Sequence, residues 1–242
     1  MLRIPDLADP RYLDEVGWFL YHERYERHQF GGSYADERLQ YSHLLLEEVL
    51  GYCGLDRAWL ADKSVVSIGC GCTGDLAAWP AAIKIAVDPL LYTYQKLGML
   101  IDDLDETNRT VHLAMGVEEL PLLDECVHLI ICRNALDHMP NPAKALQQMW
   151  RILTADGRLF LSVDLGGFPT PDEPTVFSTD SLEALLRQER FEIIRLTADE
   201  LPHSAWRDSN MRIMAGKQPQ SGLTLDREEI LRAYMARLGE HA

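Results

Sequence analysis

The stretch that decides the fold is Ser64-Val65-Val66-Ser67-Ile68-Gly69-Cys70-Gly71-Cys72-Thr73-Gly74-Asp75-Leu76. Its first five residues form a short apolar run, which predicts a buried strand. A G-x-G-x-x-G pattern follows directly. Glycines at these positions permit a tight turn and a close approach of the backbone to a ligand, and a helix N-terminus behind them favours anionic groups. The pattern alone also fits dinucleotide enzymes.

A second strand, at Lys84–Val87, ends in Asp88-Pro89. Asp88 follows the first glycine, Gly69, by 19 residues. An acidic side chain at the end of the second strand of such a fold accepts hydrogen bonds from the two hydroxyls of a ribose. The glycine pattern and Asp88 together therefore indicate a ligand of the adenosine type.

Strand-like and helix-like segments alternate on both sides of this motif. The expected strands are 64–68, 84–87, 110–114, 128–132 and 158–163, and the expected helices between them include 90–104 and 142–153. Continuous apolar strands separated by helices are typical of a parallel sheet covered on both faces. Near the end, a helix at 179–188 precedes strands at 191–196 and 211–215, which have no convincing helix between them and suggest an antiparallel pair. The predicted fold is α/β: a Rossmann-like seven-stranded sheet, mostly parallel with a reversed last strand.

The chain is expected to form a single domain over residues 1–242. Residues 1–58 are predicted to be a helical cap or lid, with one helix from Ser33 or Asp36 to about Tyr52. Residues 59–217 are predicted to be the cofactor-binding α/β core, in which Pro80 keeps the helix after the glycine motif short. Residues 218–242 are expected to add a C-terminal helix with an apolar stripe over 224–238.

The composition excludes several classes of function. Of 242 residues, 47% are hydrophobic and 25% charged, which is the average of globular proteins. The net charge of −15 argues against nucleic acid and against an anionic membrane surface as partners. No apolar run approaches the roughly 18 residues of a membrane span. The start of the chain shows no leader, and the odd count of five cysteines favours free thiols. We therefore expect a cytoplasmic protein with a small-molecule substrate, and leave a homodimer open.

Further motifs follow the glycine stretch and Asp88. They are Val117-Glu118-Glu119-Leu120-Pro121, Leu129-Ile130-Ile131-Cys132-Arg133-Asn134-Ala135-Leu136-Asp137-His138 and Trp150-Arg151-Ile152-Leu153-Thr154-Ala155-Asp156-Gly157-Arg158-Leu159. With these motifs the chain resembles, from about residue 60 to 217, the class I S-adenosylmethionine-dependent methyltransferases of the small-molecule, type 11-like group. The family's fold also has a reversed final strand.

The resemblance implies S-adenosylmethionine as cofactor and a role for each matching residue. Asp88 would hold the ribose, Pro89 and Leu90 would flank the adenine, and Val117 and Glu118 would lie near its edge. Arg133 and Asn134 would lie close to the sulfonium and the methyl acceptor. The methionine part of the cofactor would lie along the loop that contains Gly69, Cys70, Gly71 and Gly74.

A hydroxyl acceptor must also lose its proton, and a nearby His or carboxylate supplies that function. We expect the catalytic groups to be His138 and Asp137, just past the fourth strand, and Asp164, at the end of the fifth. The N-terminal segment places a polar-aromatic face at helical spacing, which we interpret as a lid lining. Its residues are Tyr21, Arg24, Tyr25 and His28, with His22 beside them. The Pro- and Gly-rich loop 166–174 is interpreted as a wall of the substrate site.

Two departures from the family pattern keep alternatives open. Ser67 replaces an acidic residue usual before the glycines, and Gly116 replaces one before the third-strand motif. They give some weight to a non-catalytic, methyltransferase-like binding or scaffold subunit. A nicotinamide-dependent oxidoreductase is less favoured because its catalytic set is missing. No metal is expected, since Cys70-x-Cys72 lacks the second ligand pair of a structural zinc site.

The acidic residues near the expected acceptor site bear on the substrate. They are Asp137, Asp164, Asp172 and Glu173. We expect them to favour a neutral polyol or a cationic amine over a phosphorylated or carboxylated acceptor. Methyl transfer to an oxygen of a sugar, metabolite or natural product is the predicted reaction.

Overall fold

The computed structural model describes residues 10–25, 34–72, 74–99, 110–200 and 209–217 of the chain. The predicted C-terminal helix at 224–238 and the predicted lid residue His28 lie outside these ranges.

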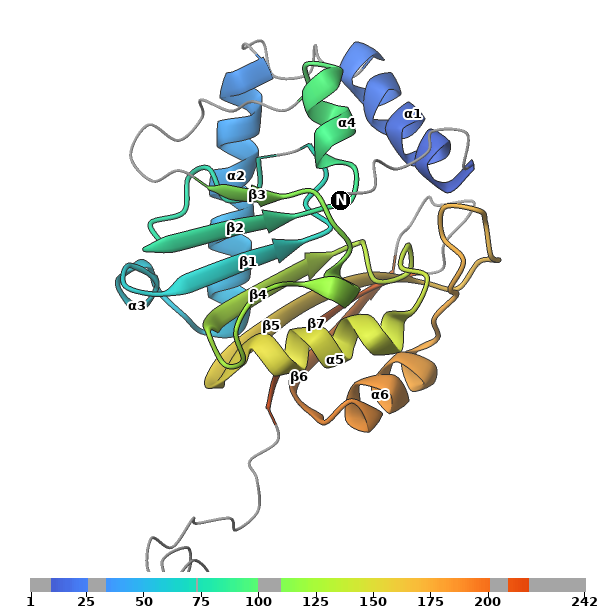
Figure 1. The fold of residues 1–242 in the computed structure, drawn as a ribbon. Coiled ribbons are helices and arrows are strands. Elements are labelled where there is room, and N and C mark those ends of the chain that lie inside the picture. Colours follow the sequence, from blue (N-terminus) through green and yellow to red (C-terminus); the bar gives the residue numbers. More distant parts are fainter. Residues whose placement is uncertain (1–9, 26–33, 73, 100–109, 201–208, 218–242) are drawn as a thin grey trace, which may run out of the picture.

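A single seven-stranded sheet forms the centre of the molecule (Figure 1). Its strands lie in the order β3-β2-β1-β4-β5-β7-β6. The last strand, β7, is antiparallel to both of its neighbours, β5 and β6, and the pairs among β1 to β5 are parallel. The predicted mixed sheet with a reversed last strand is therefore confirmed. The strands are β1 (Ser64–Ile68), β2 (Ile83–Val87), β3 (Val111–Leu113), β4 (Val127–Arg133), β5 (Leu153–Leu165), β6 (Phe191–Glu200) and β7 (Ser209–Lys217).

Helices cover the two faces of this sheet. Figure 1 shows α5 (Pro142–Ile152) and α6 (Thr179–Gln188) on one face and α2 (Tyr34–Cys53) on the other. The short helix α3 (Arg57–Leu60) precedes β1. Neighbouring residues of β1 face opposite layers of the core. Val66 packs in the hydrophobic cluster that includes α5 and α6, and Val65 packs in the cluster that includes α2. Both residues are fully buried, as expected of a strand covered on both faces.

Capping residues fix where the helices on the α5 and α6 side begin. The Asn141 side chain accepts a hydrogen bond from the Lys144 N–H, and Pro142 occupies the first turn, where its missing N–H costs nothing. Ser178 and Ser181 form a reciprocal capping box at the start of α6. These helices match the segments expected from the sequence.

Three segments differ from the prediction. Helix α4 (Leu91–Lys96) ends before Gly98, whose φ of 70° is outside helical geometry, so the expected helix to residue 104 is wrong in length. Among the described residues between β1 and β2, turns take the place of even a short helix. Strands β6 and β7 extend beyond the expected 191–196 and 211–215 because they pair with each other to Glu200 and Ser209.

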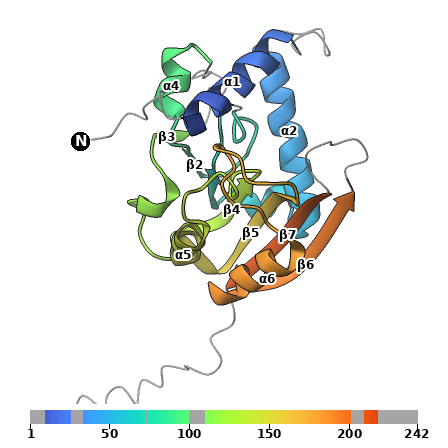
Figure 2. The same cartoon turned by 90° about the vertical axis from the view of Figure 1, so that its right-hand side faces the viewer.

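The carboxyl ends of the parallel strands meet at one edge of the sheet, where open α/β folds bind ligands. Helix α1 (Pro10–Tyr25) and α4 lie beside this edge, and a second view shows α1 crossing it next to α2 (Figure 2). All five cysteines are free thiols. None of the described helices combines the length and apolar character that a membrane crossing requires.

Candidate functional site

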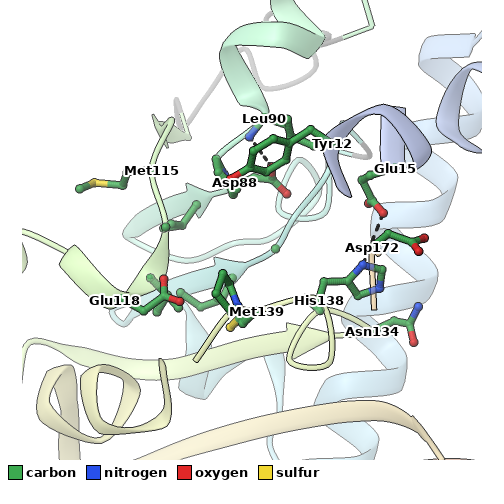
Figure 3. A pocket seen from close by; sticks show the side chains of 18 residues that line it. Tyr12, Glu15, Asp88, Leu90, Met115, Glu118, Asn134, His138, Met139 and Asp172 are labelled. Atoms are coloured by element: carbon green, nitrogen blue, oxygen red, sulfur yellow. Dashed lines mark hydrogen bonds and ion pairs between the residues drawn. The ribbon is translucent and has the colours of Figure 1, made fainter. Parts of the chain in front are cut away.

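A pocket of about 210 Å³ opens at this edge of the sheet (Figure 3). Five parts of the chain contribute its walls: α1, the ends of β1 and β2, the segment after β3, the turn after β4, and the loop between β5 and α6. The lining residues are Tyr12, Glu15, Ile68, Gly69, Val87, Asp88, Pro89, Leu90, Met115, Gly116, Val117, Glu118, Asn134, Ala135, His138, Met139, Pro140 and Asp172. Seven of the eleven predicted cofactor-binding residues therefore line one pocket.

Asp88 is the anchor of the first part of the pocket. One carboxylate oxygen accepts a hydrogen bond from the Leu90 N–H at 2.7 Å, and the other accepts one from the Gly71 N–H at 3.0 Å. The side chain thus ties the end of β2 to the glycine loop. Burial raises the pKa of Asp88 from 3.8 to about 6. The two backbone hydrogen bonds act in the opposite direction and lower the pKa, but their effect is smaller. Each oxygen keeps a second lone pair with which it can accept from a ligand hydroxyl.

The glycine loop needs its glycines for two different reasons. Gly69 has a φ of 66°, and a Cβ there would lie 2.3 Å from the Ala135 Cβ, so the loop approaches the turn after β4 too closely for any side chain. Gly71 has a φ of 56°, and a Cβ there would lie 2.6 Å from the Phe19 ring of α1. The loop is therefore enclosed by the turn on one side and by α1 on the other. Cys70, Gly71 and Gly74 do not line the pocket.

Ser67, the first departure from the family pattern, is linked to a nearby carboxylate. Its hydroxyl donates a hydrogen bond to Asp75 at 2.9 Å, and both side chains are buried. Ser42 of α2 donates to the Asp75 carbonyl at 2.7 Å, which fastens the end of the glycine loop to α2. The negative charge missing at Ser67 is thus supplied eight residues later in the chain.

The second part of the pocket wall follows β3. Val117 and Glu118 form part of the short helix η1 (Val117–Glu119), and Val117 is buried. Met115 and Gly116 precede them on the same wall. At Gly116, the second departure, an added Cβ would lie 2.8 Å from a Glu118 carboxylate oxygen, so a larger residue would require the flexible Glu118 side chain to shift. Glu118 therefore occupies the space next to Gly116.

Helix α1 packs against α4 and contributes to the wall of the pocket. Val16 packs against Leu90 and Tyr94, and the Phe19 ring meets Tyr94 edge-on at 5.4 Å between ring centroids. Tyr12 and Glu15 line the pocket itself (Figure 3). The predicted lid residues Tyr21, Arg24 and Tyr25 belong to α1, but their side chains, like His28, lie outside the described part of the chain. The predicted lining of the lid by these four residues stays a prediction.

His138 lies at the other end of the pocket, among carboxylates. Its Nδ1 lies 3.6 Å from Glu15 Oε2, and its Nε2 lies 3.5 Å from Glu173 Oε1 and 4.0 Å from Asp137 Oδ1. Figure 3 shows Glu15, His138 and Asp172 gathered here, away from Met115 and Glu118. Burial, with Asp88, Asp172 and Asp137 nearby, raises the pKa of Glu15 from 4.5 to about 7. We call this group of side chains the acidic end of the pocket, and the part around Asp88, where the sequence predicts a ribose, the ribose end.

Three further predicted site residues, Arg133, Asp137 and Asp164, are not among the residues that line this pocket, although Asp137 lies beside His138, which does. The Asp164 carboxylate accepts a hydrogen bond from the Asn210 side chain of β7 at 2.8 Å, and Asp164 is paired with Asn210 in the register of β5 and β7. The Arg133 guanidinium donates to the Tyr41 hydroxyl of α2 and lies 5.6 Å from the centre of that ring. Arg133 is the last residue of β4 and joins the α2 layer, whereas Asn134, the first residue after the strand, has a φ of 47° and lines the pocket.

Sequence reasoning missed several residues of the pocket. They are Tyr12, Glu15, Met115, Met139 and Pro140. Glu15 and Tyr12 share one face of α1 three residues apart, but a short amphipathic helix carries no signal that says what it covers. Asp172 and Glu173, weighed only as charges near the acceptor, do reach the acidic end.

Comparison with known proteins agrees with this geometry. Residues 66–161 match the family model of a methyltransferase domain. A ubiquinone biosynthesis O-methyltransferase from Glaesserella parasuis serovar 5 is 29% identical over 136 residues, which are 50% of this chain and 53% of that protein. The chain thus matches about half the length of this curated relative.

Solved structures share the fold at low identity. The 1,6-didemethyltoxoflavin-N1-methyltransferase of Burkholderia thailandensis, bound to 1,6-didemethyltoxoflavin and S-adenosylhomocysteine, is 19% identical with a TM-score of 0.53, covering 90% of this chain and 93% of that one. A chain from the complex of the Haloferax volcanii Trm112 methyltransferase activator and its candidate methyltransferase is 12% identical with a TM-score of 0.60, covering 86% and 98%. Residues 66–161 are therefore similar to a methyltransferase domain, and the described residues have the fold of the class I S-adenosylmethionine-dependent methyltransferases.

Proposed function

We propose that this protein transfers a methyl group from S-adenosylmethionine to an oxygen of a small polar acceptor. The observation that carries the proposal is Asp88, which stands at the end of β2, bonded to the glycine loop, in a pocket that continues to an acidic end. A buried carboxylate in this position is placed to accept from both ribose hydroxyls. The Burkholderia neighbour, solved with S-adenosylhomocysteine, supports the same cofactor.

The pocket divides the work between its two ends. At the ribose end, Asp88, Leu90 and Val117 would hold the nucleoside, largely through backbone and apolar contacts. At the acidic end, the acceptor would lie near Asn134 and His138. The sulfonium methyl is already an activated electrophile, so the main task of the protein is to align an acceptor lone pair with it. Oxygen attacks the methyl carbon, the C–S electron pair returns to sulfur, and the hydroxyl proton must leave.

His138 and Asp137 remain the predicted groups for handling that proton. The two side chains are neighbours in the turn after β4, and Asp137 is 1% exposed. Asp164 was predicted as a further catalytic group that holds the acceptor hydroxyl, but its carboxylate is bonded to Asn210 of β7, which argues against that role. We therefore assign no catalytic role to Asp164.

The charge of the pocket supports a neutral or cationic acceptor. Its described wall carries the carboxylates of Glu15, Asp88, Glu118 and Asp172, and no lysine or arginine. A phosphorylated or carboxylated acceptor would meet repulsion without a compensating cation. A polyol or an amine fits better, and the resemblance to a ubiquinone biosynthesis O-methyltransferase favours an oxygen as the methylated atom.

Calorimetric titration with S-adenosylmethionine, S-adenosylhomocysteine and NAD tests the proposal. We expect saturable binding of both sulfur compounds at a ratio of one to one and no heat with NAD. Binding of NAD in place of S-adenosylmethionine would favour the nicotinamide oxidoreductase instead.

A non-catalytic subunit remains the second candidate. Its support was the absence of acidic residues at Ser67 and Gly116, but Asp75 supplies a charge beside Ser67, and Glu118 fills the space beside Gly116. Binding of S-adenosylmethionine combined with no turnover on a panel of polyols, phenols and amines would favour such a subunit. Turnover of any of these acceptors would exclude it.

A further inference from the structure

Three side chains at the acidic end converge on one point. Asp137, His138 and Glu173 each offer a metal-ligating atom, and these atoms all lie within 4.8 Å of one another. Asp137 and His138 come from the turn after β4, and Glu173 comes from the loop between β5 and α6. The group is distinct from Cys70 and Cys72, whose spacing raised the question of zinc in the sequence.

The spacing of these atoms suits a shared ion better than direct hydrogen bonds. His138 Nε2 lies 3.5 Å from Glu173 Oε1 and 4.0 Å from Asp137 Oδ1, beyond the roughly 2.7–3.2 Å of a hydrogen bond. Two ligands bonded to one metal ion at about 2.1 Å, in tetrahedral or octahedral geometry, lie about 3.0–3.4 Å apart. Closing the His138–Glu173 pair from 3.5 Å and the His138–Asp137 pair from 4.0 Å to this range needs inward movements of up to about 1 Å.

The surroundings of His138 match those of a metal-binding histidine. Nε2 is shielded from solvent and makes no hydrogen bond to any described residue, whereas Nδ1 faces Glu15 at 3.6 Å. A histidine that ligates a metal through one ring nitrogen typically donates the other N–H to a carboxylate, which fixes the tautomer and the ring orientation. Glu15 stands where that partner is needed.

The two backbone segments that carry the ligands are tied together. The Thr175 N–H donates to the Asp137 carbonyl at 3.3 Å, which joins the loop after β5 to the turn after β4. Within that loop the Glu173 N–H donates to the Thr170 hydroxyl at 3.1 Å. The ligand positions are therefore set by the fold before any ion binds, which lowers the cost of assembling the site.

We propose that Asp137, His138 and Glu173 bind a divalent cation, with Glu15 as the outer partner of His138. One imidazole and two carboxylates suit ions such as Mn²⁺, Mg²⁺ or Zn²⁺. The role of the ion rests on the proposed function. The acceptor hydroxyl would coordinate it, lose its proton to a carboxylate of the acidic end and then to water, and attack the methyl carbon as an alkoxide. His138 is then a ligand rather than the general base expected from the sequence.

Titration of the intact, chelator-treated protein with Mn²⁺ tests the proposal, with bound ion measured by electron paramagnetic resonance. We expect one bound ion per chain. Glu173→Gln and His138→Ala should weaken binding at least 100-fold, and Glu15→Gln about 10-fold, the order of an outer-partner loss. The matched control is Asp172→Asn, which removes a carboxylate from the same end of the pocket without removing a ligand. It should stay within about threefold of wild type.

Two outcomes would overturn the metal site. The first is the absence of stoichiometric Mn²⁺ binding to the wild type, above all if ethylammonium binds there instead, which would point to an amine acceptor. The second is that Asp172→Asn and Glu173→Gln weaken Mn²⁺ binding equally, which would mean that the ion is attracted by the general negative charge of this end and is not bound by specific ligands. Broadening of the His138 ring signals by Mn²⁺ in the wild-type protein gives the same answer without a variant.

S-adenosylmethionine binding separates this proposal from the proposed function. We expect the chelator-treated protein to bind the cofactor with its affinity unchanged within about threefold. Loss of Mn²⁺ binding with cofactor binding intact would reject only the metal. Loss of cofactor binding in the metal-loaded protein would reject the methyltransferase.

Discussion

The two ends of the pocket are built in different ways. The ribose end is formed by two sequence motifs, the glycine loop at Gly69 and the end of β2 at Asp88. The Asp88 carboxylate there bonds to backbone N–H groups. The acidic end is assembled by α1, the turn after β4 and the loop after β5, through the side chains of Glu15, His138 and Glu173. Backbone contacts suit a ligand that related proteins share, such as a cofactor. Side chains from separate loops suit a ligand that differs between related proteins, such as an acceptor.

The largest effect at the ribose end is expected from replacing a glycine of its loop by alanine, which adds a methyl group. Gly69→Ala should lower the free energy of unfolding by about 3 kcal/mol, because it combines a left-handed backbone with a clash against the buried Ala135. Gly71→Ala should cost less, since the obstructing Phe19 ring belongs to a helix that can shift. Urea denaturation of both variants measures the difference.

Phe19→Ala serves as the control for this pair. It should recover part of the stability lost in Gly71→Ala and none of that lost in Gly69→Ala. Equal losses in the two single variants would contradict the view that the loop is enclosed by a fixed turn on one side and by α1 on the other.

Asp88→Asn should weaken S-adenosylhomocysteine binding about 100-fold, or about 2.7 kcal/mol. The same charge makes binding dependent on pH. Because burial holds the pKa of Asp88 near 6, with Asp75 also raising it, wild-type affinity should fall as the pH drops from 7 to 5. Calorimetry at several pH values should show this fall in the wild type and a smaller one in Asp88→Asn. Asp164→Asn, outside the pocket, should behave as wild type.

The stability of the protein should respond to the same group in the opposite sense. The folded pKa of about 6 exceeds the ordinary value of 3.8, so the contribution of Asp88 to stability is fully present below about pH 4 and is lost as the pH rises through 6. Asp88→Asn should therefore raise the melting temperature relative to wild type at pH 8 more than at pH 4. A gain that does not depend on pH would contradict the raised pKa.

Tyr41→Phe tests whether Arg133 belongs to the α2 layer rather than to the pocket. It removes the hydroxyl that accepts from the guanidinium and should cost about 1–2 kcal/mol of stability. Cofactor affinity should stay within about twofold of wild type in calorimetry. A tenfold loss of affinity with unchanged stability would restore Arg133 to the cofactor site.

The smallest effect is expected from Asp172→Asn on cofactor binding. Asp172 lines the acidic end, and its carboxylate accepts a hydrogen bond from the Thr170 hydroxyl at 2.7 Å. If the two ends act independently, S-adenosylhomocysteine affinity should change by less than about threefold. A loss comparable to that of Asp88→Asn would show that the ends form one site.

The contrast between the ends also explains how far the sequence could be interpreted. Gly69 and Asp88 are set by a local geometry that has a fixed spacing, so both were predicted and both line the pocket. Arg133 and Asn134 were predicted together, but only Asn134 lines the pocket, because the Arg133 side chain at the end of β4 bonds to Tyr41 of α2. The hydrogen bond of Asp164 could not be predicted, because its partner, Asn210, lies on a strand far away in the chain. Glu15 depends on how α1 crosses the sheet, which no local pattern records.

Helix α1 has a consequence for the timing of a catalytic cycle. Through Phe19 it rests on the glycine loop, and through Glu15 it reaches His138, so one helix closes over both ends of the pocket. Uptake of cofactor and release of methylated product would then share one opening movement. Turnover would be limited by how often α1 lifts, and a variant that loosens it, such as Phe19→Ala, would exchange its ligands faster while holding them less tightly.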